Sequence, residues 1–106
     1  FQAERIMSYI KANYKEDINL SHASGALFIS GRQINRIMEK RFGQSFHSCL
    51  MNHRIMVAKA LLATTTLPIE QVAAEAGFSS HFYMYQVFKR QGLPTPAFIR
   101  SCSHVD

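Results

Sequence analysis

The feature that most constrains the fold is an internal repeat of two helical segments. A short segment, a turn and a longer segment occupy residues 19–43, and the same pattern recurs at 68–92. The offset is 49 residues in the short segment and 50 in the longer one, where Ile34 corresponds to Met84. The second turn is therefore one residue longer than the first. This arrangement indicates two helix-turn-helix units, and chance repetition of amphipathic helices is the alternative.

The remaining residues also follow the periodicity of helices, and no stretch has the period-2 alternation of a strand. Asn and Ser at helix starts, Pro in first turns and Gly at helix ends mark the limits. The expected helices are 4–13, 20–27, 31–42, 45–63, 68–77, 81–92 and 97–100, with Ser79 or Ser80 capping the sixth. We therefore predict an all-α chain in which one long central helix connects the two repeats.

Length and charge narrow the class of protein further. The chain has 106 residues, the size of one domain, and a net charge of +5. Positive and negative residues cancel in 1–30 and in 60–106, so the excess lies between Arg32 and Lys59. A focal basic patch is typical of proteins that bind a polyanion, because neutralising phosphates releases counterions. A basic face that is merely solvated is the alternative.

Other patterns argue against an enzyme and against a metal site. The carboxylates are single or in surface pairs and the histidines are scattered, so no catalytic cluster is expected. Cys49 and Cys102 form no CxxC pair and fit no zinc spacing, which predicts two idle thiols and neither metal nor cofactor. No apolar run is long enough to span a membrane. The first residue, Phe1, indicates a fragment with something missing upstream.

The second helix of the first repeat carries the best candidates for base contacts. In a helix-turn-helix, exposed residues near the start of the second helix reach base edges in the major groove. Here those residues include Arg32, Asn35 and Arg36. Arginine can bind guanine, and asparagine adenine, through two hydrogen bonds, while Ser30 and the N-terminus that it caps can bind a phosphate. An ordinary solvated polar face is the alternative.

The second repeat has four residues at equivalent places, His81, Phe82, Tyr85 and Gln86. No arginine is exposed among them, which predicts weaker base contacts than those of the first repeat. Exposed aromatic rings could pack on thymine methyl groups or on sugars. The alternative is that Phe82 lies in the core beside Phe78.

A signature in the second half of the chain extends these predictions. It consists of Ala76-Gly77-Phe78-Ser79-Ser80, Tyr83, Val87-Phe88-Lys89, Thr95-Pro96 and Arg100, preceded by Arg54-Ile55, Ala58, Leu61 and Leu62. Over residues 4 to about 101 the chain resembles the DNA-binding domain of the AraC/XylS family. The resemblance implies seven helices in two homeodomain-like helix-turn-helix subdomains, about 4–44 and 67–101, joined by a linker helix at 45–63. It also implies that a monomer docks on two adjacent major grooves.

The resemblance assigns a set of DNA contacts by position. The base contacts fall on Arg32, Asn35, Arg36, His81, Phe82, Tyr85 and Gln86. We expect phosphate contacts at Ser30, Gln33, Lys40, Arg41, Arg54, Ser80, Lys89 and Arg90. The chain departs from the family where Phe28 replaces a glycine of the first turn, where Gln86 replaces a frequent arginine, and where Gly92 is displaced before Thr95-Pro96.

Together these features predict a bacterial cytoplasmic protein, associated with the nucleoid, that binds specific double-stranded DNA. It is expected to regulate transcription, by activation rather than repression. The expected partners are DNA, RNA polymerase and a regulatory or dimerisation domain upstream, without a membrane. A helical protein–protein interaction module that does not bind DNA is the alternative function.

A partner surface is also expected on the long helix. On a helical wheel, Cys49 and Met56 fall together on the flank away from Phe46 and Leu50. We expect this stripe to contact RNA polymerase or the upstream domain. Scattered exposed apolar residues without a partner are the alternative.

Overall fold

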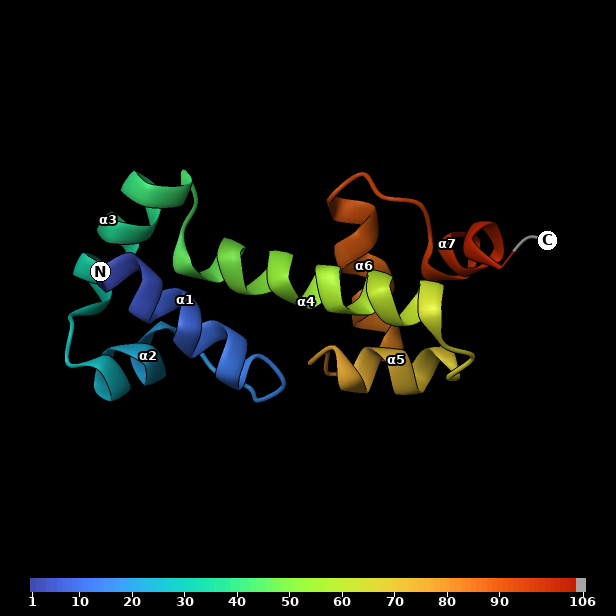
Figure 1. Cartoon of the computed structure of the whole chain (residues 1–106), viewed down its shortest axis with the longest axis horizontal. Coiled ribbons are helices and arrows are strands. Elements are labelled where there is room, and N and C mark those ends of the chain that lie inside the picture. The colour runs from blue at the N-terminus through green and yellow to red at the C-terminus, as the bar shows by residue number, and fades with distance from the viewer. Residues whose placement is uncertain (105–106) are drawn as a thin grey trace. The chain divides into compact units, whose positions relative to one another are not determined.

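The computed structural model describes residues 1–104, which form seven α-helices with no strand among them (Figure 1). The helices are α1 (Gln2–Asn13), α2 (Leu20–Leu27), α3 (Gly31–Phe42), α4 (Phe46–Thr64), α5 (Ile69–Glu75), α6 (His81–Arg90) and α7 (Pro96–Ser103). The all-α prediction is confirmed. The largest difference from the expected limits is α7, which was expected to end near residue 100. Within the described residues, no helix is long and apolar enough to cross a membrane.

Side-chain caps explain where most of the helices begin. Ser30, Ser80 and Thr95 each accept a hydrogen bond from the backbone N–H three residues further on, at 3.1–3.2 Å. Ser45 does the same for α4 at 3.2 Å, and Asn19 starts α2 with a reciprocal capping box. These bonds satisfy N–H groups that have no partner within the helix.

The chain divides into two compact units, Phe1–His53 and Arg54–Asp106, and the boundary falls inside α4. In the first unit α3 contacts both α1 and α2, and in the second unit α5 contacts α6. Each unit therefore holds one short helix and one longer helix joined by a turn (Figure 1). The predicted pair of helix-turn-helix elements is confirmed.

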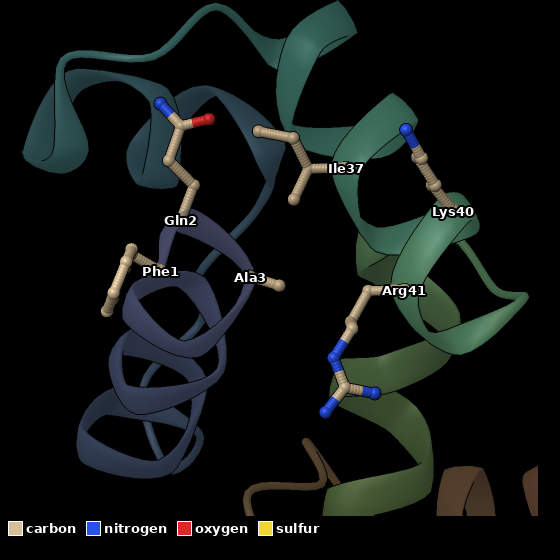
Figure 2. Close-up of a pocket in the computed structure, with 6 residues that line it drawn as sticks. All are labelled: Phe1, Gln2, Ala3, Ile37, Lys40 and Arg41. Atoms are coloured by element: carbon tan, nitrogen blue, oxygen red, sulfur yellow. The ribbon is translucent and has the colours of Figure 1, made fainter.

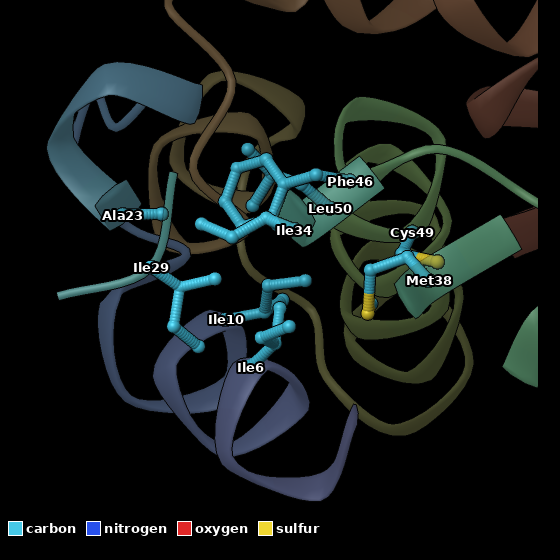
Figure 3. Packing of buried hydrophobic residues seen from close by; sticks show 9 residues of the cluster. All are labelled: Ile6, Ile10, Ala23, Ile29, Ile34, Met38, Phe46, Cys49 and Leu50. Carbon is cyan, nitrogen blue, oxygen red and sulfur yellow. The ribbon is translucent and has the colours of Figure 1, made fainter. Parts of the chain in front are cut away.

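The core of the first unit lies where α1, α2, α3 and the first turns of α4 meet. Figure 3 shows the side chains that fill it, and all of them are buried: Ile6, Ile10, Ala23, Ile29, Ile34, Met38, Phe46, Cys49 and Leu50. Since α3 buries Ile34 and Met38 here, its opposite side is left for solvent. The core therefore fixes which face of α3 is available to a partner.

The second unit has an equivalent core around α6. Its buried residues are Ile55, Ala58, Leu62, Val72, Ala73, Ala76, Phe78, Met84, Val87 and Phe88. The Phe78 ring contacts the rings of Tyr83 and Phe88 edge-on, with centroids 6.1 and 6.5 Å apart. Such edge-to-face pairs are the preferred aromatic geometry and fix the orientation of α6 within its unit.

The expected stripe on α4 is wrong for one of its two residues. Cys49 belongs to the core of the first unit, and burial raises the pKa of its thiol. Met56 is exposed, as expected. Met56 is therefore the one large apolar side chain of α4 that is exposed, and the expected pair with Cys49 is absent.

Candidate nucleic-acid interface

The exposed side of α3 carries a stripe of positive charge. Arg32, Arg36 and Lys40 are all exposed and follow one another at intervals of four residues. Residues four apart lie on the same face of a helix, so these cations form one row beginning at the helix N-terminus. The only acidic residue of α3 is Glu39. The stripe has the geometry and charge to follow a polyanion.

Hydrogen bonds organise the start of this stripe. The hydroxyl of Ser30 accepts the backbone N–H of Gln33, and the Gln33 side chain accepts a hydrogen bond from Arg36. Gln33 was expected to contact a phosphate, and its carbonyl oxygen instead holds the Arg36 guanidinium over the first turn. The N-terminus of α3 and its dipole still favour a phosphate beside Ser30.

Asn35 has a structural role that the sequence pattern did not indicate. Its side-chain oxygen accepts the backbone N–H of Phe46 at 2.9 Å, and so Asn35 caps the start of α4. Bidentate pairing with adenine would require this amide to turn away and leave the N–H unpaired. The expected base contact therefore does not fit the place of Asn35.

Arg41 turns to the other side of α3, toward α1. Its guanidinium lies 3.4 Å from a carboxylate oxygen of Glu4 and 4.9 Å from the centre of the Phe42 ring. Arg41 also lines an open hollow with a volume of about 500 Å³. Figure 2 shows the residues that line it, which are Phe1, Gln2, Ala3, Ile37, Lys40 and Arg41. Because Glu4 shares its charge, Arg41 is a weaker phosphate ligand than Arg32 or Arg36.

The turn before α3 has an unusual backbone. Phe28 ends α2 with φ at +57°, the left-handed region, and its side chain is 93% exposed. Phe28 therefore adopts the left-handed conformation that glycine commonly takes at the end of a helix. This conformation strains the backbone, because residues that carry a side chain disfavour the left-handed region.

The exposed side of α6 is chemically different from that of α3. Phe82, Gln86 and Lys89 are exposed, and Tyr85 is half-buried. The Phe82 side chain is 72% exposed, so the alternative that it packs in the core beside Phe78 is wrong. Positive charge appears only in the last turn, at Lys89 and Arg90.

His81 and Phe82 stack on each other at the start of α6. Their ring centroids are 4.0 Å apart and the ring planes are inclined by 34°. His81 is half-buried, so the stack fixes the Phe82 ring to the body of the unit. The start of α6 therefore presents a pair of stacked aromatic rings, where the start of α3 presents arginines.

One expected phosphate contact is buried and does not belong to this surface. Arg54 has only 7% of its surface exposed and interacts within the protein. The burial of Arg54 could not be predicted from its position in the basic part of the sequence, because the direction of its side chain depends on how α4 packs. No group of three or more metal-ligating side chains occurs in residues 1–104.

A half-buried arginine, Arg100, holds the C-terminal helix in place. Arg100 donates hydrogen bonds to the backbone carbonyls of Leu62 and Leu67, the first at 3.4 Å. It thereby fastens α7 to the end of α4 and to the segment before α5. Arg100 therefore supports the packing of the second unit.

Comparison with known proteins identifies the family. Residues 23–101 match the model of a family described as a helix-turn-helix domain. The uncharacterized HTH-type transcriptional regulator YfiF of Bacillus subtilis is 32% identical over 88% of this chain and 29% of its own length. The C-terminal domain of the two-component response regulator YesN from Fusobacterium nucleatum is 32% identical, with a TM-score of 0.84 over 92% of this chain and 95% of that domain.

A solved DNA complex shares the fold at lower identity. The DNA-binding domain of AdpA, solved with a target DNA, is 22% identical, with a TM-score of 0.86 over 94% of this chain and 90% of that one. The chain spans between 23% and 34% of the length of the curated relatives. The matched family, the named relatives and the seven-helix fold all agree with the resemblance found in the sequence. The chain belongs to the AraC-type helix-turn-helix family of DNA-binding transcription regulators.

Proposed function

We propose that this chain binds a specific double-stranded DNA site by inserting α3 and α6 into major grooves. Two subdomains, about 4–44 and 67–101, each supply one of these helices, and α4 links them. The observation that carries the proposal is the row of exposed cations that starts at the capped N-terminus of α3. In a helix-turn-helix this end of the second helix is the part that reaches base edges.

The base contacts that fit the structure are fewer than those expected from sequence. Arg32 and Arg36 are exposed on the first unit and can each pair with a guanine. On the second unit the base-facing residues are His81, Phe82, Tyr85 and Gln86. Asn35 is left out because it caps α4.

Phosphate contacts surround these residues. We assign them to Ser30, Lys40, Arg41, Ser80, Lys89 and Arg90, which are all exposed. Gln33 supports Arg36, and Arg54 is buried, so neither of them is included. Cations and helix N-termini at the edge of a groove set the register of a protein on DNA without selecting sequence.

The experiment that tests this function is selection from a random-sequence duplex library, followed by titration of the enriched site. The chain should enrich one motif. The R32A/R36A double variant should lose the preference for guanine at the positions that α3 contacts, because two bidentate base contacts are removed. The single variants R32A and R36A should each weaken binding to the enriched site by a similar amount. K11A is the matched control, because Lys11 is an exposed cation on α1 outside the interface. Failure to enrich any motif would contradict the proposal.

In the cell, the regulator containing this chain acts in the bacterial cytoplasm, on the nucleoid, and activates transcription without an enzymatic activity. RNA polymerase and an upstream regulatory or dimerisation domain are its further partners. The exposed Met56 of α4 supports a protein contact there, since it is one of the few large apolar side chains on the surface. M56E in the longer protein should reduce activation while DNA binding is retained, and the exposed K59E on the same helix is its control.

A further inference from the structure

The two DNA-facing helices can be compared position by position, because each begins after a serine cap. Ser30 caps α3 and Ser80 caps α6, each by accepting the backbone N–H three residues further on, at 3.2 and 3.1 Å. Counted from these caps, Phe82 occupies the second position of α6, and Arg32 occupies the second position of α3. An aromatic ring therefore lies where the first unit has an arginine.

Phe82 has the properties of a preformed contact surface. Its side chain is 72% exposed, and its ring lies against that of the half-buried His81 at 4.0 Å between centroids. Stacking restricts the directions that the ring can take, so little conformational entropy is lost when it meets a partner. The ring has no group that donates or accepts an ordinary hydrogen bond to a base edge.

In the major groove, thymine offers a methyl group on C5, and the other base-specific groups are hydrogen-bond donors and acceptors. We infer that Phe82 recognises a thymine through this methyl group. The inference rests on the proposed function, and it names the chemical feature that the second unit selects. Lys89 and Arg90, in the last turn of α6, provide the charge that keeps this helix on a phosphate backbone.

The neighbouring position agrees with the same kind of base pair. Gln86 is exposed one turn after Phe82 and corresponds to Arg36 of the first unit. A glutamine side chain pairs with adenine through N6 and N7, whereas arginine pairs with guanine. The second unit therefore selects A·T pairs by a methyl contact and a carboxamide, and the first unit selects guanine by bidentate hydrogen bonds from arginine.

The test uses the DNA site obtained by selection, with each thymine replaced singly by deoxyuridine. Deoxyuridine lacks only the C5 methyl group, so base pairing is unchanged. Replacement of one particular thymine should lower the affinity of the native chain about four-fold, because one methyl group is no longer buried against Phe82. F82A should bind the thymine and deoxyuridine duplexes equally at that position. K11A, with its change far from α6, should keep the four-fold difference.

A second variant makes the inference falsifiable by a gain of preference. F82R introduces at this position the residue type that Arg32 has in the first unit. When the selection is repeated with F82R, the enriched site should contain guanine in place of that thymine. Thermal unfolding of both variants should match the native chain because Phe82 is exposed. The inference is overturned if no thymine is sensitive to its methyl group, or if the sensitivity persists in F82A.

The outcomes also separate this inference from the proposed function. A chain that enriches no DNA site contradicts the proposed function. A chain that enriches a site, yet ignores every thymine methyl group, contradicts only the role of Phe82. If F82A leaves DNA affinity unchanged on all duplexes but lowers activation by the longer protein, Phe82 binds a protein instead, and the inference is wrong.

Discussion

Phe28 is the one non-glycine residue in the described part of the chain with a positive φ. It ends α2 by donating its backbone N–H to the carbonyl of Ser24 at 3.0 Å, as a glycine would at such a helix end. Its ring is almost fully exposed, so no packing within the unit offsets the strain. The helix-turn-helix geometry of this turn is therefore imposed by the packing of α2 and α3, against the preference of the residue.

Replacing Phe28 by glycine should raise the stability of the chain. The left-handed conformation costs a side-chain-bearing residue about 1–2 kcal/mol, and the greater freedom of glycine in the unfolded chain removes part of the gain. We expect F28G to raise the free energy of unfolding by about 1 kcal/mol in urea denaturation followed by circular dichroism. F28A keeps the Cβ and its strain, so it should lie near the native value. A destabilised F28G would show that the ring has a packing role.

The unequal chemistry of the two units predicts unequal effects of single substitutions. Arg36 can make two charged hydrogen bonds to guanine, and R36A should weaken binding to the selected site by about 1–3 kcal/mol. Gln86 makes neutral contacts, so Q86A should cost distinctly less. Competition binding of both variants against the native chain measures the ranking. The reverse order would mean that the second unit dominates recognition.

At these positions the sequence predicted well which face of a helix is exposed, but it predicted poorly what an individual side chain contacts. Arg32 and Arg36 are exposed as expected, because the apolar positions of α3 define one buried face. The capping role of Asn35 could not be predicted, because its partner, Phe46, lies eleven residues away, beyond the reach of helical periodicity. The sequence did not decide whether Phe82 is buried or exposed, because an aromatic residue fits either a core or a contact surface and only packing decides between them.

Among the elements, α4 explains why a single helical wheel is misleading. Its first turns bury Phe46, Cys49 and Leu50, and its later turns bury Ala58 and Leu62. On a 100° wheel these two sets lie on different sides, because the halves of α4 belong to different units. A single wheel averages the two halves of α4, and this average wrongly placed Cys49 on the exposed side of the helix. The helix limits themselves were predictable, since they depend on local caps and on turn residues.

The start of α4 also depends on α3, through the hydrogen bond of Asn35. N35A should lower the free energy of unfolding by about 1 kcal/mol, because the N–H of Phe46 loses its partner. N35D keeps the acceptor and places a negative charge at a helix N-terminus, which is favourable, so it should restore the stability. Thermal and urea unfolding compare the two variants. If N35A is as stable as the native chain but loses preference at one adenine, the base contact first expected for Asn35 is correct.

At the scale of the whole molecule, the exposed cations of both units determine how DNA affinity depends on salt. Five cations of the proposed interface have no carboxylate partner in the described residues, namely Arg32, Arg36, Lys40, Lys89 and Arg90. Arg41 also belongs to the interface, but Glu4 partly neutralises it, and Arg54 is buried. Each phosphate neutralised contributes about −0.9 to the slope of log K against log salt, which predicts a slope of about −4 to −5. Fluorescence anisotropy of a labelled duplex, titrated from low to moderate salt, measures it.

Two substitutions test whether the cations act as the structure places them. K40Q removes one phosphate contact, so the slope should become shallower by about one unit while sequence preference is kept. E4Q releases Arg41 from its carboxylate at 3.4 Å, and the slope should then become steeper because another cation is free to neutralise a phosphate. R54Q is unsuitable as a test because the loss of a buried charge would disturb folding. A flat salt dependence of the native chain would exclude phosphate binding by both units, whatever the base preference of α3.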